Sequence, residues 1–171
     1  MPAGSYTEEE GATGVEFCKD CPAGYYCEAG CDTPIACEPG TMNPMVGQTE
    51  VAACQPCTSG FACTRRGLAT PDYPCAPGYY CPGGNHRPNQ TEWACPPGTF
   101  NDFNNLTAID QCQPCPETTA CLIGTGGQQK PPVACGTGHY CPLGTGSPNQ
   151  YPCPAGSWTN QTDLSEARQC Y

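Results

Sequence analysis

The residues of this sequence best suited to chemistry are its 18 cysteines, in a chain of 171 residues. A thiol can bind zinc, take part in dithiol redox chemistry or form a disulfide. Cys-x2-Cys pairs, which all three uses share, stand at Cys18/Cys21, Cys54/Cys57 and Cys112/Cys115. A structural zinc site needs four ligands, and the two histidines, His86 and His139, do not have zinc-finger spacing. We therefore interpret the cysteines as disulfide partners and expect no metal and no cofactor.

Other reactive constellations are weak. Glu8-Glu9-Glu10 is acidic, but it lacks the alternating oxygen ligands and the turn glycine of a calcium loop. We interpret this run as a solvated face. A hydrolase that uses a serine or aspartate side chain would need it close to a histidine in a shaped cleft, and a chain of this composition does not favour such a cleft. The sequence therefore predicts no catalytic residues and no enzyme.

The composition leaves too little hydrocarbon for an ordinary core. Leu, Ile, Val and Phe supply only 16 residues, whereas Gly and Pro supply 21 each. A chain this poor in large apolar side chains is either disordered or held by cross-links. Disulfides persist in oxidising surroundings, so we expect an extracellular protein, either secreted or on a cell surface.

The charge excludes several partners. The formal net charge is −10, and Arg65-Arg66 is the only adjacent basic pair. Nucleic-acid affinity comes from Lys and Arg at the phosphates, so nucleic acid is a poor partner, as is an anionic membrane surface. No run of about 18 apolar residues occurs, so we expect no membrane segment in this chain.

The cysteines repeat with a fixed period. Cys37, Cys95 and Cys153 are each 58 residues apart, and Cys54, Cys112 and Cys170 follow the same interval. Between Cys121 and Cys135 the spacing is two residues longer than at the earlier equivalent position. These intervals predict four segments: a truncated, irregular repeat over 1–36, complete repeats over 37–94 and 95–152, and the start of another over 153–171.

The first segment departs from the pattern. Aligned with Cys153, Met1 stands where the repeat expects a cysteine, and Cys31 is additional. This alignment suggests a fragment of a longer chain, with Cys18 lacking its expected partner. The pairing of Cys18, Cys21, Cys27 and Cys31 stays open, because cysteine spacing alone does not define connectivity.

Gly and Pro interrupt the chain every few residues, which limits secondary structure. Gly40, Gly98 and Gly156 follow a cysteine by three residues and predict turns with positive φ. We expect strands of two to four residues and single helical turns within 163–168, 48–53 and 106–111. The predicted fold class is small and disulfide-rich, with elongated tandem modules, mostly irregular loops, short β-hairpins and little helix.

The string Cys95-Pro-Pro-Gly-Thr-Phe, followed by Cys112-Gln-Pro-Cys115, resembles the ephrin-receptor-like cysteine-rich repeat, which is akin to modules of the tumour necrosis factor receptor. The resemblance covers essentially the whole chain. It implies that cysteines pair first with second, third with fifth and fourth with sixth in each repeat. Carried over, the expected bridges are Cys37–Cys54, Cys57–Cys75, Cys63–Cys81, Cys95–Cys112, Cys115–Cys135, Cys121–Cys141 and Cys153–Cys170.

Two further sets of residues are candidates for function. N-glycosylation sequons begin at Asn89, Asn105 and Asn160, and Ser, Thr and Pro offer positions for O-linked sugars. Aromatic or Met side chains recur at fixed repeat positions, namely Tyr6, Met42, Phe100 and Trp158, and Tyr26, Tyr80 and Tyr140. We interpret them as rings packed on disulfides or neighbouring modules; the alternative is an apolar surface that binds a partner.

These features predict an extracellular structural or adhesive role, such as a segment of a glycosylated surface stalk or filament subunit. Its expected partners are neighbouring repeats, copies of itself and glycans. The alternative is the ligand-binding ectodomain of a cell-surface receptor, whose partner would be a protein ligand. The resemblance implies contact functions of this kind and no catalysis.

Overall fold

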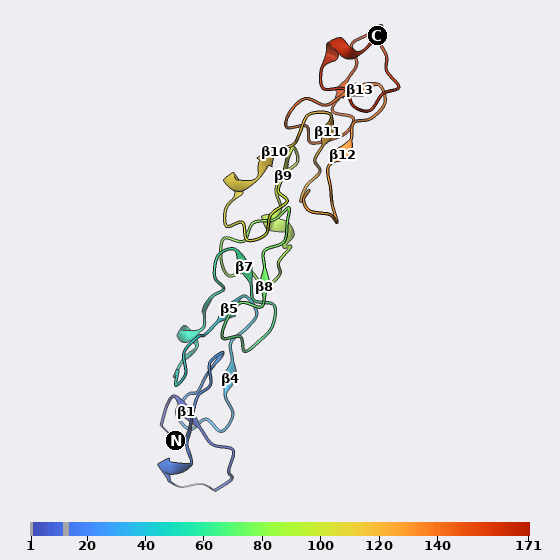
Figure 1. Ribbon diagram of the computed structural model, residues 1–171. Coiled ribbons are helices and arrows are strands. Elements are labelled where there is room, and N and C mark those ends of the chain that lie inside the picture. The colour runs from blue at the N-terminus through green and yellow to red at the C-terminus, as the bar shows by residue number, and fades with distance from the viewer. Residues whose placement is uncertain (1, 12–13) are drawn as a thin grey trace. The chain divides into compact units, whose positions relative to one another are not determined.

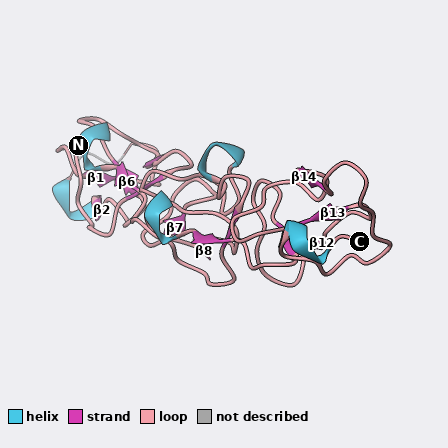
Figure 2. Ribbon diagram, turned by 90° about the horizontal axis from the view of Figure 1, so that it is seen from above, coloured by secondary structure: helices cyan, strands magenta, loops and turns pink. Residues whose placement is uncertain are grey.

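The computed structural model describes residues 2–11 and 14–171 (Figure 1). Loops dominate it, and the strands are two residues long (Figure 2). Met1, where the repeat predicts a cysteine, lies outside the described residues. The strands are β1 (Ser5–Tyr6), β2 (Lys19–Asp20), β3 (Tyr25–Tyr26), β4 (Ile35–Ala36), β5 (Thr41–Met42), β6 (Gln55–Pro56), β7 (Phe61–Ala62), β8 (Tyr73–Pro74), β9 (Thr99–Phe100), β10 (Gln113–Pro114), β11 (Thr119–Ala120), β12 (Val133–Ala134), β13 (His139–Tyr140) and β14 (Tyr151–Pro152).

The strands form antiparallel pairs, each made of strands consecutive in the chain. In β5–β6, for example, Thr41 lies opposite Pro56 and Met42 opposite Gln55. From β3 onward, the first strand of a pair begins four residues after a cysteine, and the second ends directly before another cysteine. A single β-bridge, Tyr79 to Ala94, stands at the corresponding place between β8 and β9. The expected short hairpins are confirmed.

Single turns of 3-10 helix precede several cysteines. They are η1 (Val15–Phe17), η2 (Val51–Ala53), η3 (Thr91–Trp93), η4 (Ile109–Gln111) and η5 (Ala167–Gln169). Three of them lie at or within one residue of the ranges in which the sequence predicts helical turns. In η4 the Gln111 side chain accepts hydrogen bonds from the backbone of Thr107 and Ala108, which closes the turn. In η5 Gln169 makes the equivalent bonds to Ser165 and Glu166.

The long disulfide loops follow the prediction. Cys37–Cys54, Cys95–Cys112 and Cys153–Cys170 are all bonded, each closing a sequence separation of 17. Their Cα–Cα distances lie between 5.5 and 5.9 Å, the usual span of a disulfide. First-with-second pairing is therefore confirmed in all three repeats.

The short loops correct the prediction. The expected bridges Cys57–Cys75, Cys63–Cys81, Cys115–Cys135 and Cys121–Cys141 are wrong. The structure instead has Cys57–Cys63, Cys115–Cys121, Cys135–Cys141 and, in the irregular first segment, Cys21–Cys27, all with a sequence separation of 6. Cys75 and Cys81 are each disulfide-bonded as well. Cys31 keeps a thiol, which donates to the carbonyl of Thr33.

A local turn explains why neighbouring cysteines in the chain pair with each other. In the loop Cys57–Cys63, the amide of Phe61 donates to the carbonyl of Thr58 at 3.1 Å, with Gly60 at a φ of 82° between them. That hydrogen bond and a positive φ at the third turn residue fit a type II turn. Because the turn reverses the chain within six residues, it brings the two sulfur atoms together.

The same turn recurs after the first cysteine of both short and long loops. We call the residue three positions after that cysteine the turn glycine. The turn glycines are Gly24, Gly40, Gly60, Gly78, Gly98, Gly138 and Gly156, all with positive φ. Thr118 takes this place in the loop Cys115–Cys121, also with a positive φ, 69°. The true structural repeat is therefore a loop of 16 to 20 residues, three of which make each 58-residue period.

Two turn glycines show how closely backbone encloses this position. Gly40 donates its amide to Cys63 and accepts from the amide of Cys57, both at 2.8 Å. A Cβ built on Gly40 would lie 2.7 Å from the carbonyl oxygen of Gly84. Gly98 is equivalent: its Cβ would lie 2.5 Å from the carbonyl oxygen of Gly144. Glycine is thus required there both by φ and by the close approach of a later loop.

The core consists mainly of sulfur. Among the described residues, the buried hydrophobic positions comprise twelve cysteines, Ala62, Ala120, Leu106 and Leu164. Other interior positions are occupied by polar side chains instead of aliphatic ones. Asn43, Asn101 and Thr159 are at most 3% exposed and stand 58 residues apart. Asn43 donates to the carbonyl of Tyr25 and accepts from the amide of Met45. Cross-links and satisfied polar groups therefore hold these loops.

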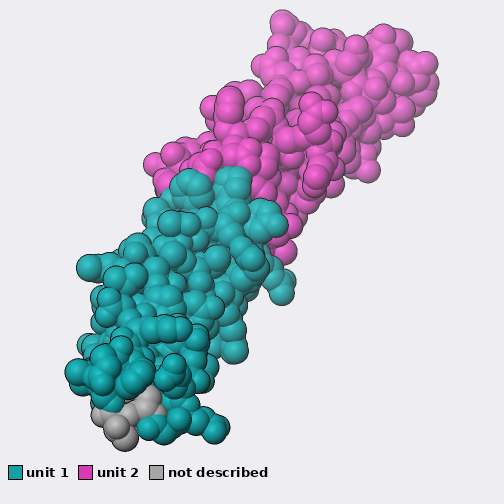
Figure 3. All heavy atoms as spheres, turned by 60° about the horizontal axis from the view of Figure 1, so that its bottom comes forward, with its two compact units in different colours: residues 1–74, 81–88 teal, residues 75–80, 89–171 magenta. Residues whose placement is uncertain are grey.

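The chain divides into two compact units, coloured separately in Figure 3. Unit 1 comprises residues 1–74 and 81–88, with the hairpins from β1 to β8. Unit 2 comprises residues 75–80 and 89–171, with the hairpins from β9 to β14. Among the described residues, no helix is long and apolar enough to cross a membrane.

Candidate functional site

The three sequon asparagines are not buried. Asn105 has a positive φ of 66°, and its backbone N–H donates to the carbonyl of Cys75. The sequon threonine Thr107 donates its hydroxyl to the side chain of Gln111. Asn160 follows the buried Thr159, and Asn89 precedes η3. Each asparagine therefore has its side chain where a glycan could be attached without disturbing the core.

The recurrent aromatic residues lie on the hairpins. Tyr80 packs edge-on against Trp93 with ring centroids 5.6 Å apart, and Tyr140 packs against Tyr151 at 5.7 Å. Tyr26 lies opposite Ile35 in β3–β4. These contacts support cross-strand packing for this set, a usual source of sheet stability.

The second aromatic set differs from the first mainly at Trp158. Tyr6, Met42 and Phe100 are the second residues of β1, β5 and β9 and are partly exposed. Trp158 is 59% exposed. Its backbone pairs with Tyr171 through two hydrogen bonds, of 2.9 and 3.1 Å. Trp158 therefore presents its ring largely to solvent, whereas its backbone is fixed.

The acidic run Glu8–Glu10 lies on an exposed surface. Glu8 accepts a hydrogen bond from the ammonium group of Lys19 at 2.8 Å. That bond and the attraction between the opposite charges lower the pKa of Glu8 and raise the pKa of Lys19. Among the described residues, no group of three or more His, Cys, Asp or Glu side chains is arranged to hold a metal ion.

The adjacent arginines form ion pairs within unit 1. Arg66 binds Glu38 at 2.8 Å, and Arg65 donates to Asp72 at 3.2 Å. Asp72 also accepts hydrogen bonds from the amide and the hydroxyl of Thr64, at 2.8 and 2.6 Å. Burial raises the pKa of Asp72, but these bonds outweigh burial and lower it overall. The bonds of Asp72 to Thr64 and Arg65 thus close the loop after Cys63. Both arginines are paired with carboxylates and do not form a basic patch.

The candidate zinc and redox residues do not come together as a site. In the first complete repeat, the Cys-x2-Cys pair is split between different disulfides: Cys54 bonds to Cys37, and Cys57 bonds to Cys63. The second complete repeat is split in the same way. His139 has its Nδ1 atom 2.9 Å from the carbonyl oxygen of Thr137. His86 belongs to unit 1, whereas His139 belongs to unit 2.

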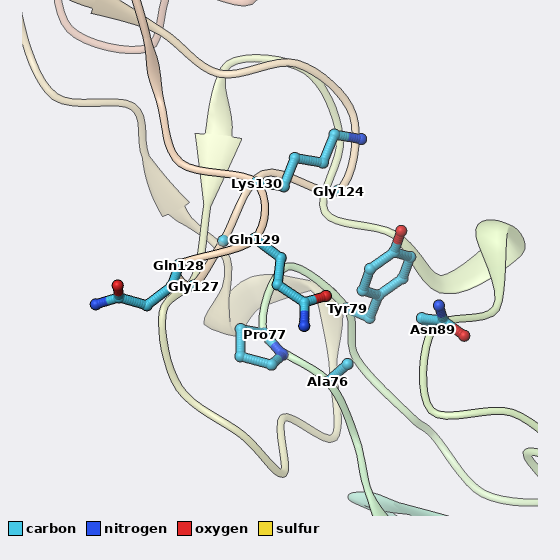
Figure 4. Close-up of a pocket in the computed structure, with 10 residues that line it drawn as sticks. Ala76, Pro77, Tyr79, Asn89, Gly124, Gly127, Gln128, Gln129 and Lys130 are labelled. Carbon is cyan, nitrogen blue, oxygen red and sulfur yellow. The ribbon is translucent and has the colours of Figure 1, made fainter.

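Unit 2 contains a side pocket that sequence reasoning missed. It is a hollow of about 520 Å³ lined by Tyr79, Asn89, Gln129 and Lys130, with Ala76, Pro77, Gln128 and glycines completing the wall (Figure 4). Its outer wall is the segment 124–130. This segment contributes to the interval between Cys121 and Cys135 that is two residues longer than its equivalent. The insertion is visible in the sequence, but nothing there indicates which surface it faces.

Backbone contacts fix the wall of the pocket. The amide of Gly126 donates to Lys130, and the amide of Gly127 donates to the carboxylate of Asp102, both at 2.8 Å. A Cβ on Gly126 would lie 2.4 Å from the amide nitrogen of Gly78, so only glycine fits there. The inserted segment is therefore held against the loop that carries Tyr79.

No protein-family model and no curated protein matches this chain. The functional interpretation therefore rests on the residues and their geometry.

Proposed function

We propose that this chain is an extracellular structural or adhesive segment, part of a glycosylated surface stalk or filament subunit. The observation that carries the proposal is the sulfur core: among the residues that the structure describes, twelve buried cysteines hold loops with very few buried aliphatic side chains. Such a structure requires an oxidising compartment and resists unfolding without a large globular core. Of the resemblance to ephrin-receptor-like repeats, the cysteine motif and the first-with-second pairing remain, and they suit the same role.

The way the loops bind their neighbours suits a load-bearing segment. A turn glycine shares backbone hydrogen bonds with the next loop and contacts the one after it, as Gly98 does with Cys121 and Gly144. Repeat proteins whose parts contact only near neighbours gain stability by adding more parts. The role therefore needs no catalytic residue, and we propose none.

A protein-binding ectodomain is the second candidate, favoured by exposed apolar side chains. Met45 and Val46 are 60% and 61% exposed, and Leu122 and Ile123 are 42% and 52% exposed. Contiguous exposed apolar surface marks contact sites, so these two pairs of neighbouring residues are where we would place the contacts with a partner. Here the contact would be with a protein ligand rather than with another copy of the chain.

One experiment separates the two candidates. The native protein is isolated under non-reducing conditions and imaged by electron microscopy, and its neighbours on intact cells are cross-linked and identified by mass spectrometry. Filaments, or cross-links between copies, support the structural role. Isolated single molecules cross-linked to one different protein would instead identify a receptor ectodomain.

A further inference from the structure

The sequon asparagine Asn89 is one of the residues that line the pocket of unit 2. Neither of the other sequon asparagines lines it. In Figure 4, Asn89 lies beside Tyr79, and Gln129 extends toward them from the inserted segment. We propose that this pocket is a saccharide site, which holds the first sugars of the N-linked glycan carried by Asn89. The proposal rests on the glycosylation that forms part of the proposed function.

The lining suits a neutral sugar. Tyr79 is partly exposed and offers a ring face, on which the apolar face of a pyranose packs. The side chains of Asn89 and Gln129 make no hydrogen bond among the described residues, so the Gln129 amide, which extends into the pocket, can bind hydroxyl and acetamido groups of a sugar. Lys130 is the one charged residue among the lining residues, and its ammonium group already donates to the carbonyl of Ile123. An anionic ligand would find little to bind.

The pocket is also preformed. Gly126 and Gly127 are tied to Lys130 and Asp102, which fixes the segment carrying Gln128 and Gln129. The backbone of Tyr79 is held by its β-bridge to Ala94, and its ring end lies over Gly124, where a Cβ would meet the hydroxyl oxygen at 3.0 Å. A binding group held on a rigid frame loses less entropy when it engages a ligand.

Covalent attachment to Asn89 compensates for the weak affinity that a shallow pocket has for a free sugar. A ligand tethered beside its site has an effective concentration of about millimolar or more. Contacts too weak to retain a free sugar are then sufficient to hold a tethered one. The glycan at Asn89 should therefore lie against the protein, whereas glycans at Asn105 and Asn160 extend into solvent.

The test measures access to each glycan. The whole chain is secreted from a host that attaches high-mannose glycans, and occupancy of the three asparagines is mapped by mass spectrometry. The folded, oxidised protein is then treated with an endoglycosidase that cuts between the two core N-acetylglucosamines. We expect cleavage at Asn89 to be about threefold to tenfold slower than at Asn160, the range that one or two sugar contacts provide.

Two variants identify the pocket as the cause. Gln129→Ala removes an amide that extends into the pocket, and Tyr79→Leu keeps an apolar side chain but removes the ring face. Both should raise the cleavage rate at Asn89 toward the rate at Asn160 and leave Asn160 unchanged. Gln128→Ala is the matched control, because the Gln128 side chain points the other way in Figure 4, and it should change neither rate.

The outcomes distinguish this inference from the proposed function. The saccharide site would be overturned if the glycan at Asn89 were cleaved as fast as the glycan at Asn160, or if Gln129→Ala left its cleavage rate unchanged. Glycosylation itself would stand in either case. An unoccupied Asn89 on the secreted protein would also overturn it, whereas occupied Asn105 or Asn160 would still support a glycosylated chain. A chain that is secreted with none of the three asparagines occupied would remove the glycosylation on which both rest.

Discussion

At the scale of single residues, glycine has two separate tasks in this protein. One is to adopt a positive φ in the turn after a cysteine, and the other is to let a later loop approach the backbone. Gly98 performs both, whereas Gly156 has the same sign of φ but no atom within 4 Å of the place that a Cβ would take. The two positions therefore allow the tasks to be separated experimentally.

We expect Gly98→Ala to lower the free energy of unfolding more than Gly156→Ala does. Left-handed backbone costs an alanine about 1–2 kcal/mol at either position. At Gly98 the new methyl group must also displace the carbonyl of Gly144, which adds about 1–3 kcal/mol. Urea unfolding of the oxidised protein measures both variants. Equal losses would show that the close approach of Gly144 is not a constraint.

Asp72 should make the stability of unit 1 depend on pH. Its folded pKa is lowered by hydrogen bonds from Thr64 and Arg65 that outweigh burial, whereas the unfolded value is about 3.9. The carboxylate therefore stabilises the fold above about pH 4, and this contribution is lost as pH falls through the folded pKa. Asp72→Asn should cost about 1.5–3 kcal/mol at pH 7, because it removes hydrogen bonds to a charged group.

The measurement is the unfolding free energy of the wild type and of Asp72→Asn from about pH 7 to about pH 2. The difference between them should begin to shrink below about pH 4, where the carboxyl of the unfolded chain takes up a proton, and should be lost once the pH falls through the lowered folded pKa. Asp110→Asn, at an exposed carboxylate, serves as the control and should change stability little at any pH. A difference between wild type and Asp72→Asn that stayed constant would contradict the assigned role.

At the scale of elements, the loop beginning at each cysteine is the building unit, and one loop departs from its pattern. Thr118 stands at the turn-glycine position with a φ of 69°. Thr118→Gly should raise the unfolding free energy by up to about 1 kcal/mol, because relief of left-handed strain exceeds the entropy cost of glycine. Thr119→Gly, in strand β11, should lower it. A loss of stability in Thr118→Gly, measured by urea unfolding, would mean that the threonine side chain has a stabilising contact.

The two loop sizes should contribute unequally to stability. Removing the bridge Cys95–Cys112 with paired serines frees a separation of 17, whereas removing Cys115–Cys121 frees a separation of 6. Loop-closure entropy makes the longer bridge worth about 1 kcal/mol more. Chemical unfolding of the two double variants measures the difference. A larger loss from the shorter bridge would show that sulfur packing, not loop closure, dominates.

The sequence predicts short strands of two to four residues and single helical turns, and its resemblance to a known repeat implies the long bridges; the short bridges are not predicted. Three loops make up each 58-residue period. When the sequence is aligned on that longer period, Cys57 and Cys63 occupy two different positions of one unit, and nothing marks them as the two ends of a loop. The shared Cys-x2-Gly start, visible at Gly24, Gly60 and Gly78, is the signal for the shorter repeat. Buried Asn43 and Asn101 also escape sequence reasoning, because asparagine is ordinarily a surface residue.

The pocket of unit 2 is beyond sequence reasoning for a different reason. The two extra residues between Cys121 and Cys135 are evident. The contact between Gly126 of this interval and Gly78 depends on which loops lie next to each other, and local patterns carry no information on that. The prediction of Asn89 as a sequon needs only its tripeptide, whereas its position beside Tyr79 needs the structure.

At the scale of the whole molecule, disulfides take the place that buried hydrocarbon has in most proteins. Leu106 and Leu164 are the only large aliphatic side chains buried among the described residues. Each buries enough surface for about 2 kcal/mol, whereas ordering a single residue costs about 1–2 kcal/mol of backbone entropy. Once the disulfides are gone, the remaining core cannot offset the entropy of 171 residues.

Complete reduction should therefore unfold the chain under otherwise native conditions. We expect the dispersed amide signals of a proton–nitrogen correlation spectrum to collapse into the narrow range of an unfolded chain. The loss should parallel the number of thiols that react with an alkylating reagent. A sample held in the same buffer without reductant is the control, and reoxidation of the unalkylated chain should restore the spectrum. A dispersed spectrum with every cysteine alkylated would show that hydrogen bonds and side-chain packing hold the fold by themselves, and the proposed extracellular role would lose its main support.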